Sequence, residues 1–89
     1  MVKVKFRFSY SLMVTQPRST TVVRLKSKSQ RASVTSEDIS QAVKDAWALA
    51  MKKAWSRCIP VAATYIEAVD VTVVKMDITS FSIEGANDD

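Results

Sequence analysis

The feature that most constrains this fold is a strict alternation of side-chain types over residues 2–14. One set of alternate positions is apolar or aromatic: Val4, Phe6, Phe8, Tyr10 and Leu12. The positions between them are basic or small and polar: Lys3, Lys5, Arg7, Ser9 and Ser11. Because successive side chains of a β-strand point to opposite faces, this alternation predicts a half-buried strand with one apolar face and one basic face.

A second strand is expected over residues 20–28, after a proline-containing turn at residues 16–19. A turn of four residues would bring the apolar faces of the two strands together and also their basic faces, as a consistent hairpin requires. The pairs in this register would be Thr15–Thr20, Leu12–Val23, Tyr10–Leu25 and Arg7–Lys28.

Residues 29–34 are expected to form a polar loop, followed by a helix from about residue 36 to residue 57. Thr35 would be its N-cap, with Asp38 three positions later as in a capping box, and the helix would stop before Pro60. The alanines of its buried stripe would let the helix lie close to the sheet. This stripe would consist of Ile39, Ala42, Val43, Ala46, Ala50 and Ala54, widened by Trp47 and Leu49.

A third strand is expected over residues 66–77, and residues 78–83 would either continue it or form a short fourth strand. Val73-Val74 breaks the alternation and predicts a β-bulge. Residues 85–89 are expected to be a disordered acidic tail. The sequence therefore predicts one compact α+β domain over residues 1–84 with the order β-β-α-β. Its antiparallel sheet would have three or four strands, the first of them central, with one helix packed on one face.

Charge is divided unevenly along the chain. Residues 1–36 contain eight basic side chains and no acidic one, whereas the other 53 residues contain nine acidic and five basic side chains. Six of the eight alternate along the two predicted strands, which would concentrate them on one face of the sheet. The eight are Lys3, Lys5, Arg7, Arg18, Arg24, Lys26, Lys28 and Arg31. A concentrated positive surface is typical of proteins that bind phosphates or acidic partners.

The first functional hypothesis is a small non-enzymatic module that contacts the phosphates of DNA or RNA with little sequence specificity. The alternating basic residues would make these contacts, with Arg18 and Arg31 at the rim. No base-stacking platform is expected, because the aromatic residues of the first strand fall on the face that the helix should cover. The alternative is a solvated face that protects the sheet edges, with Asp70 pairing with Lys5 or Arg7.

The second hypothesis is an inhibitor or adaptor that docks the basic face on an acidic or nucleic-acid-binding protein. In size and character the chain is similar to the small proteins with which phages block host machinery, such as anti-CRISPR-like inhibitors of defence complexes. Trp55, roughly opposite the buried stripe, would be a protein-contact anchor unless Phe81 and Ile83 fold over it. A third hypothesis is a homodimer joined through a sheet edge or an exposed helix face.

Composition argues against several other classes. The chain has no histidine, no Gly-rich phosphate loop and no serine elbow, so we expect no enzymatic activity, no metal site and no cofactor. Cys58 is the single cysteine and is expected to be a small buried hydrophobe, without a disulfide. No stretch approaches the ~20 apolar residues of a membrane span. The N-terminus lacks the apolar run of a signal peptide, so a cytoplasmic, reducing location is expected.

Overall fold

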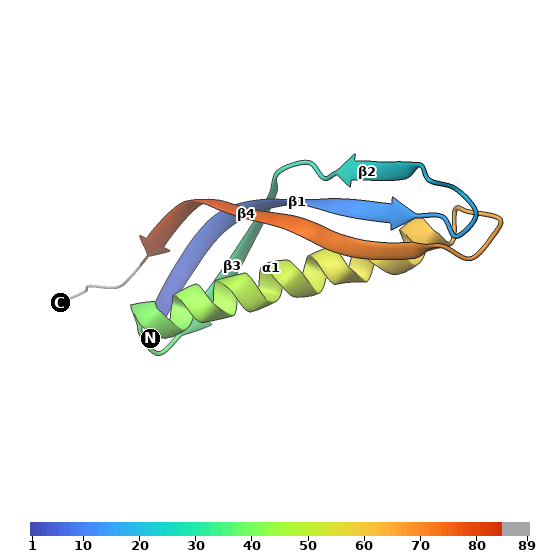
Figure 1. Cartoon of the computed structure of the whole chain (residues 1–89). Helices are drawn as coiled ribbons and strands as arrows, with labels where there is room; N and C mark the ends of the chain where they lie inside the picture. The colour runs from blue at the N-terminus through green and yellow to red at the C-terminus, as the bar shows by residue number, and fades with distance from the viewer. Residues whose placement is uncertain (85–89) are drawn as a thin grey trace.

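In the computed structural model, which describes residues 1–84, one helix packs on one face of an antiparallel sheet (Figure 1). The elements in chain order are β1 (Val2–Thr15), β2 (Val22–Lys26), β3 (Gln30–Ser36), α1 (Ile39–Ala62) and β4 (Asp70–Glu84). The predicted α+β fold and the central position of β1 are confirmed. The predicted order β-β-α-β lacked one strand, since β3 precedes the helix.

β1 pairs with one strand along one edge and with two strands along the other. Along one edge β1 pairs with β4 over nearly its whole length, from Lys3 opposite Glu84 to Thr15 opposite Asp70. Along the other edge it pairs with β3 at residues 2–8 and with β2 at residues 11–15. The sheet is therefore a long ribbon three strands wide, in which one edge strand is broken into β2 and β3.

The prediction of a polar loop at residues 29–34 was wrong, because β3 occupies residues 30–36. Only Ala32 and Val34 give this strand an apolar side, which is too few residues for a clear period-two signal. The connection between β2 and β3 is hydrogen-bonded to the central strand. Ser27 donates its backbone N–H to the Tyr10 carbonyl at 2.8 Å, and Ser27 Oγ accepts from the Tyr10 N–H at 2.9 Å.

The register of the hairpin differs from the predicted one by two residues. Leu12 lies opposite Leu25 rather than Val23, because the connection between β1 and β2 has six residues instead of four. A shift of two preserves the faces of both strands, so the basic residues of β2 stay on the predicted side. Arg7, however, lies opposite Arg31 of β3 and not opposite Lys28.

The helix begins and ends later than the sequence predicted. Asp38 is the N-cap and accepts from the Gln41 backbone N–H at 2.8 Å, whereas Thr35 belongs to β3. Pro60 lies inside α1 instead of ending it. A proline so near the C-terminus removes one backbone hydrogen bond from the final turns, and Ala63 still donates to the Ile59 carbonyl at 3.0 Å.

The core is formed by small residues of α1 on the large residues of β1. The buried row of α1 consists of Ala42, Ala46, Ala50 and Ala54. The buried side chains of β1 are Val4, Phe6, Phe8, Tyr10, Leu12 and Val14. Cys58 extends the alanine row and is half-buried, and desolvation raises the pKa of its thiol. The predicted burial of Ile39, Val43 and Trp47 was wrong, because each is about half exposed.

Two irregularities interrupt the pairing of β4 with β1. One is at Val74, which confirms the predicted bulge at Val73-Val74. The other is near Ser80, whose φ of 54° lies in the left-handed region that favours glycine. Bulges bend strands and increase their twist, and β1 and β4 curve together in Figure 1. β4 begins at residue 70 rather than 66, residues 78–83 continue it, and the predicted tail at residues 85–89 lies outside the described residues.

Candidate anion-binding face

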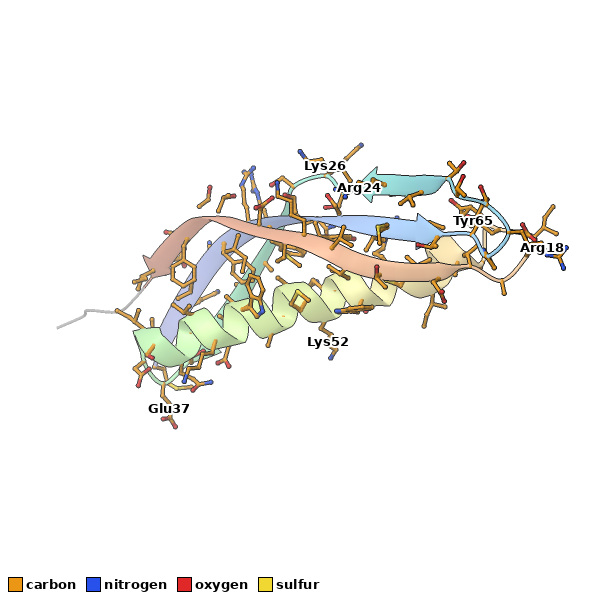
Figure 2. All side chains as sticks on the ribbon, viewed as in Figure 1. Arg18, Arg24, Lys26, Glu37, Lys52 and Tyr65 are labelled. Carbon is orange, nitrogen blue, oxygen red and sulfur yellow. The ribbon has the colours of Figure 1, made fainter. Side chains whose placement is uncertain are left out.

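The face of the sheet that α1 leaves uncovered, here called the outer face, carries six of the predicted site residues. Paired residues on neighbouring strands point to the same side, so three strands contribute to one surface. The contributors are Lys3, Lys5 and Arg7 from β1, Arg24 and Lys26 from β2, and Arg31 from β3; all are exposed. Figure 2 shows Arg24 and Lys26 on β2, on the side of the sheet away from α1 and its Lys52.

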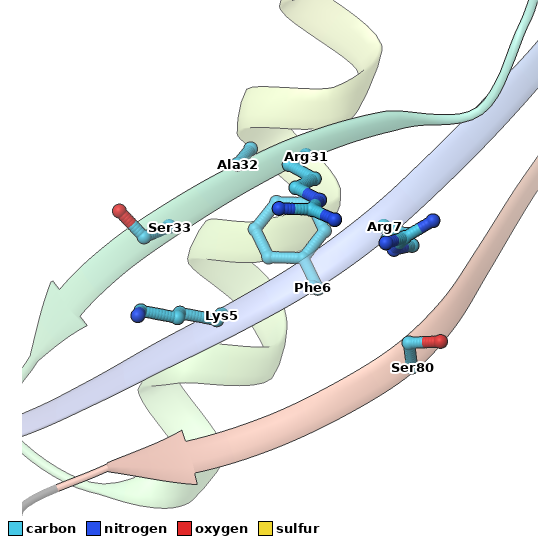
Figure 3. Close-up of a pocket in the computed structure, with 7 residues that line it drawn as sticks. All are labelled: Lys5, Phe6, Arg7, Arg31, Ala32, Ser33 and Ser80. Atoms are coloured by element: carbon cyan, nitrogen blue, oxygen red, sulfur yellow. The ribbon is translucent and has the colours of Figure 1, made fainter.

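Three of these cations surround a hollow beside the N-terminal half of β1 (Figure 3). Lys5 and Arg7 come from β1 and Arg31 comes from β3, and the hollow has a volume of about 510 Å³. Phe6, Ala32, Ser33 and Ser80 complete the lining. The hollow lies where β4 loses its regular pairing with β1, since the register shifts between Lys5 and Arg7.

Arg7 and Arg31 carry like charges on directly opposite positions of two strands. The ion pairs within residues 1–84 are Lys5–Glu84 and Lys75–Asp77, so neither arginine has a carboxylate partner in this part of the chain. Like charges placed opposite each other across strands destabilise a sheet. An anion bound between the two guanidinium groups would offset this repulsion.

Lys5 is partly neutralised by the end of β4. Its Nζ lies 2.9 Å from Glu84 Oε2. The hydrogen bond from Lys5, together with the charges of Lys5 and Lys3, lowers the pKa of Glu84, although desolvation acts in the opposite direction. The predicted pairing of Asp70 with Lys5 or Arg7 was wrong, because Asp70 lies opposite Thr15 at the far end of β1.

The remaining basic residues lie farther along the sheet. Lys26 is opposite Ser11, four residues from Arg7 and so ~13 Å along β1 at about 3.3 Å per residue. Lys28, in the connection between β2 and β3, lines a second hollow with Lys26 and with Arg57 of α1. Arg18 lies in the loop after β1, at the end of the sheet far from the first hollow (Figure 2).

Sequence reasoning placed Arg31 in a loop and did not select Arg57. The position of Arg31 depends on β3, which has little apolar alternation to reveal it. The position of Arg57 depends on which flank of α1 faces β2 and β3, and no local pattern specifies that flank. The signal that did identify the outer face was the alternation of basic residues in β1 and β2.

The chemistry at the outer face is that of hydrogen-bond donors with positive charge. Within the described part of the chain, no three side chains that could ligate a metal come together. In the same residues no helix is both long enough and apolar enough to cross a bilayer. No family model, no curated protein and no solved structure matches this chain.

Proposed function

We propose that this protein is a non-enzymatic module that binds nucleic acid through its phosphate backbone, using the outer face of the sheet. The observation that carries the proposal is the pair Arg7 and Arg31. These two guanidinium groups flank one hollow and have no carboxylate partner within residues 1–84. Guanidinium groups bind phosphate oxygens bidentately, so a phosphate in the hollow could accept hydrogen bonds from both.

Contacts to the backbone rather than to bases fit the composition of the outer face. Phe6, Phe8 and Tyr10 are buried under α1 and cannot stack on bases. The outer positions farther along β1 are Ser9, Ser11 and Met13. Phosphate contacts position a nucleic acid without reading its sequence, so little sequence specificity is expected.

The distribution of charge favours a linear polyanion over a compact one. The molecule measures 60 × 17 × 17 Å along its principal axes. The hollow and the Arg24–Lys26 group follow the long direction of the sheet. Successive phosphates of one strand could therefore contact both groups, which a single small anion could not do.

Fluorescence anisotropy with labelled single- and double-stranded DNA and RNA tests the proposal. If about six phosphates or more are neutralised, affinity should fall by about 10³ or more between about 50 and 200 mM salt. The double variant Arg7→Glu/Arg31→Glu should lose binding at both salt concentrations. The matched control Lys44→Glu/Lys52→Glu makes the same change in charge on the exposed side of α1 and should bind. Absence of binding by the wild type at the lower salt contradicts the proposal.

A second candidate function is docking on an acidic protein as an inhibitor or adaptor. The observation that favours it is Trp55, which is 46% exposed on α1, since tryptophan and arginine are enriched where protein interfaces bind most tightly. Size-exclusion chromatography with a candidate acidic partner would then give a stoichiometric complex. The Arg7→Glu/Arg31→Glu variant should abolish this complex, and the protein alone should not bind nucleic acid.

A further inference from the structure

One flank of α1 carries an uninterrupted apolar row along the whole helix, here called the apolar ridge. Every fourth residue belongs to it, and residues four apart are neighbours on a helix surface. The ridge consists of Ile39, Val43, Trp47, Met51, Trp55 and Ile59. Five of the six are between 46% and 78% exposed. Continuous exposed apolar surface of this kind marks an interaction site.

The apolar ridge faces the β4 side of the molecule. The opposite flank of α1 faces β3 and β2, since Asp45 accepts a hydrogen bond from Ser36 and Arg57 lines a hollow with Gln30. Four ridge residues, Ile39, Val43, Trp47 and Met51, each lie three positions before a buried alanine. Asp45 and Arg57 each lie three positions after one, so they are on the other side of the alanine row. Phe81 and Ile83 of β4 are also exposed, at 39% and 42%, so β4 carries apolar surface of its own.

Beside the apolar ridge, β4 offers a free strand edge. It is fifteen residues long and pairs with β1 on one side, and within the described residues no strand pairs with its other side. No proline or glycine interrupts it. An edge of this length presents a row of N–H and C=O groups to which another strand can pair.

We propose that a second copy of this chain covers this surface, by antiparallel pairing of β4 with β4 about a two-fold axis near Met76. The charge pattern of the strand fits its own copy. Lys75 and Asp77 flank Met76 on the outer face. An axis at Met76 therefore places Lys75 of each copy opposite Asp77 of the other. Moving the axis to Asp77 would instead place the two aspartates opposite each other.

The helices of the two copies would face each other across this axis. The strands across the dimer would be β1 and β4 of one copy, then β4 and β1 of the other. Because α1 packs over β1, the two helix axes would be separated by three strand spacings, ~14 Å at about 4.8 Å each. Directly packed helices lie about 8–10 Å apart, so this wider gap needs large side chains. Tyr10 pairs with Met76 and lines a hollow with Arg57, so the turn of α1 that carries Trp55 lies level with the axis.

The accessible surface of the chain is larger than that of a compact protein of the same mass. The accessible surface of the chain is 6136 Å². A compact monomer of 9.9 kDa exposes about 5,200 Å², so the whole chain exposes about 900 Å² more than that. A standard interface removes about 800 Å² from each partner. This inference rests on α1 and β4 and is independent of the arginines that carry the proposed function.

Sedimentation equilibrium of the full chain over a wide concentration range tests the dimer. The expected result is a mass twice the 9.9 kDa of one chain. Lys75→Glu should raise the dissociation constant by about tenfold or more, because it places glutamate opposite aspartate. The double variant Lys75→Glu/Asp77→Lys exchanges both charges and should restore the wild-type constant, which separates a lost contact from misfolding. Trp55→Asp should also favour the monomer.

Two results overturn the proposal. One is a wild-type chain that stays monomeric at every concentration. The other is a dimer whose dissociation constant is unchanged by Lys75→Glu and by Trp55→Asp. Nucleic-acid binding depends on Arg7 and Arg31 instead, so it can succeed or fail separately from dimerisation.

Discussion

Asp45 joins the end of β3 to the first half of α1. The buried Ser36 donates from Oγ to Asp45 Oδ2, and Gln41 Nε2 donates to Asp45 Oδ1 at 2.9 Å. These hydrogen bonds lower the pKa of Asp45, although desolvation acts in the opposite direction. A carboxylate whose pKa is lowered by folding stabilises the native state above its ordinary pKa. This contribution is lost as the pH falls through the lowered value.

We therefore expect Asp45→Asn to melt at a lower temperature near neutral pH and to lose less stability on acidification than the wild type does. Circular-dichroism melts from about pH 6 to about pH 2 measure the difference. Glu67→Gln is the control, since it removes one carboxylate from the connection between α1 and β4. Parallel pH profiles for Asp45→Asn and the wild type would show that Asp45 has no such role.

In the proposed function Glu84 would compete with the bound phosphate for Lys5, because its carboxylate lies 2.9 Å from the Lys5 ammonium group. Glu84→Gln removes that charge and should tighten nucleic-acid binding. The slope of log affinity against log salt should steepen by up to about 0.7–0.9, the value of one phosphate contact. Asp70→Asn makes the same change in charge at the far end of β1 and should have a smaller effect. Equal effects from the two variants would mean that net charge, rather than the hollow, governs binding.

The elements differ in how strongly short sequence patterns specify them. β1 and the bulge at Val74 were predicted because period-two alternation, and its interruption, are local signals. The start of α1 was misplaced because Thr35 and Asp38 are both good N-cap residues. The pairing of β3 with β1 decides between them, and that contact joins residues distant in sequence. The same missing strand concealed the pairing of Arg31 with Arg7, so the basic face was predicted but its hollow was not.

The close contact between α1 and the sheet depends on small side chains at the buried row of the helix. Ala50→Leu should destabilise the protein by about 1–3 kcal/mol, because a larger side chain must displace α1 from β1. Ala48→Leu adds the same side chain on the exposed side of α1 and should change stability little. Urea denaturation of the two variants measures the difference. Equal midpoints for the two variants would rule out tight packing at Ala50.

The molecule as a whole is long and thin. The radius of gyration is 16.3 Å, whereas a compact chain of 89 residues has a value of about 12 Å. A single layer of side chains between one helix and a narrow sheet forms the core, which leaves the apolar ridge and the edge of β4 uncovered. The same elongation spreads the basic residues along the sheet, so both proposed binding surfaces follow from one shape.

The order of the strands also has a kinetic consequence. β2, β3 and α1 lie between the central strand and its long partner β4, so Lys3 and Glu84 pair across 81 positions of the chain. Contacts between such distant residues slow folding, because a large loop must close before they can form. During translation, one edge of β1 must remain unpaired until the last fifteen described residues have left the ribosome. The nascent chain is therefore exposed to aggregation through this edge of β1 until β4 pairs with it.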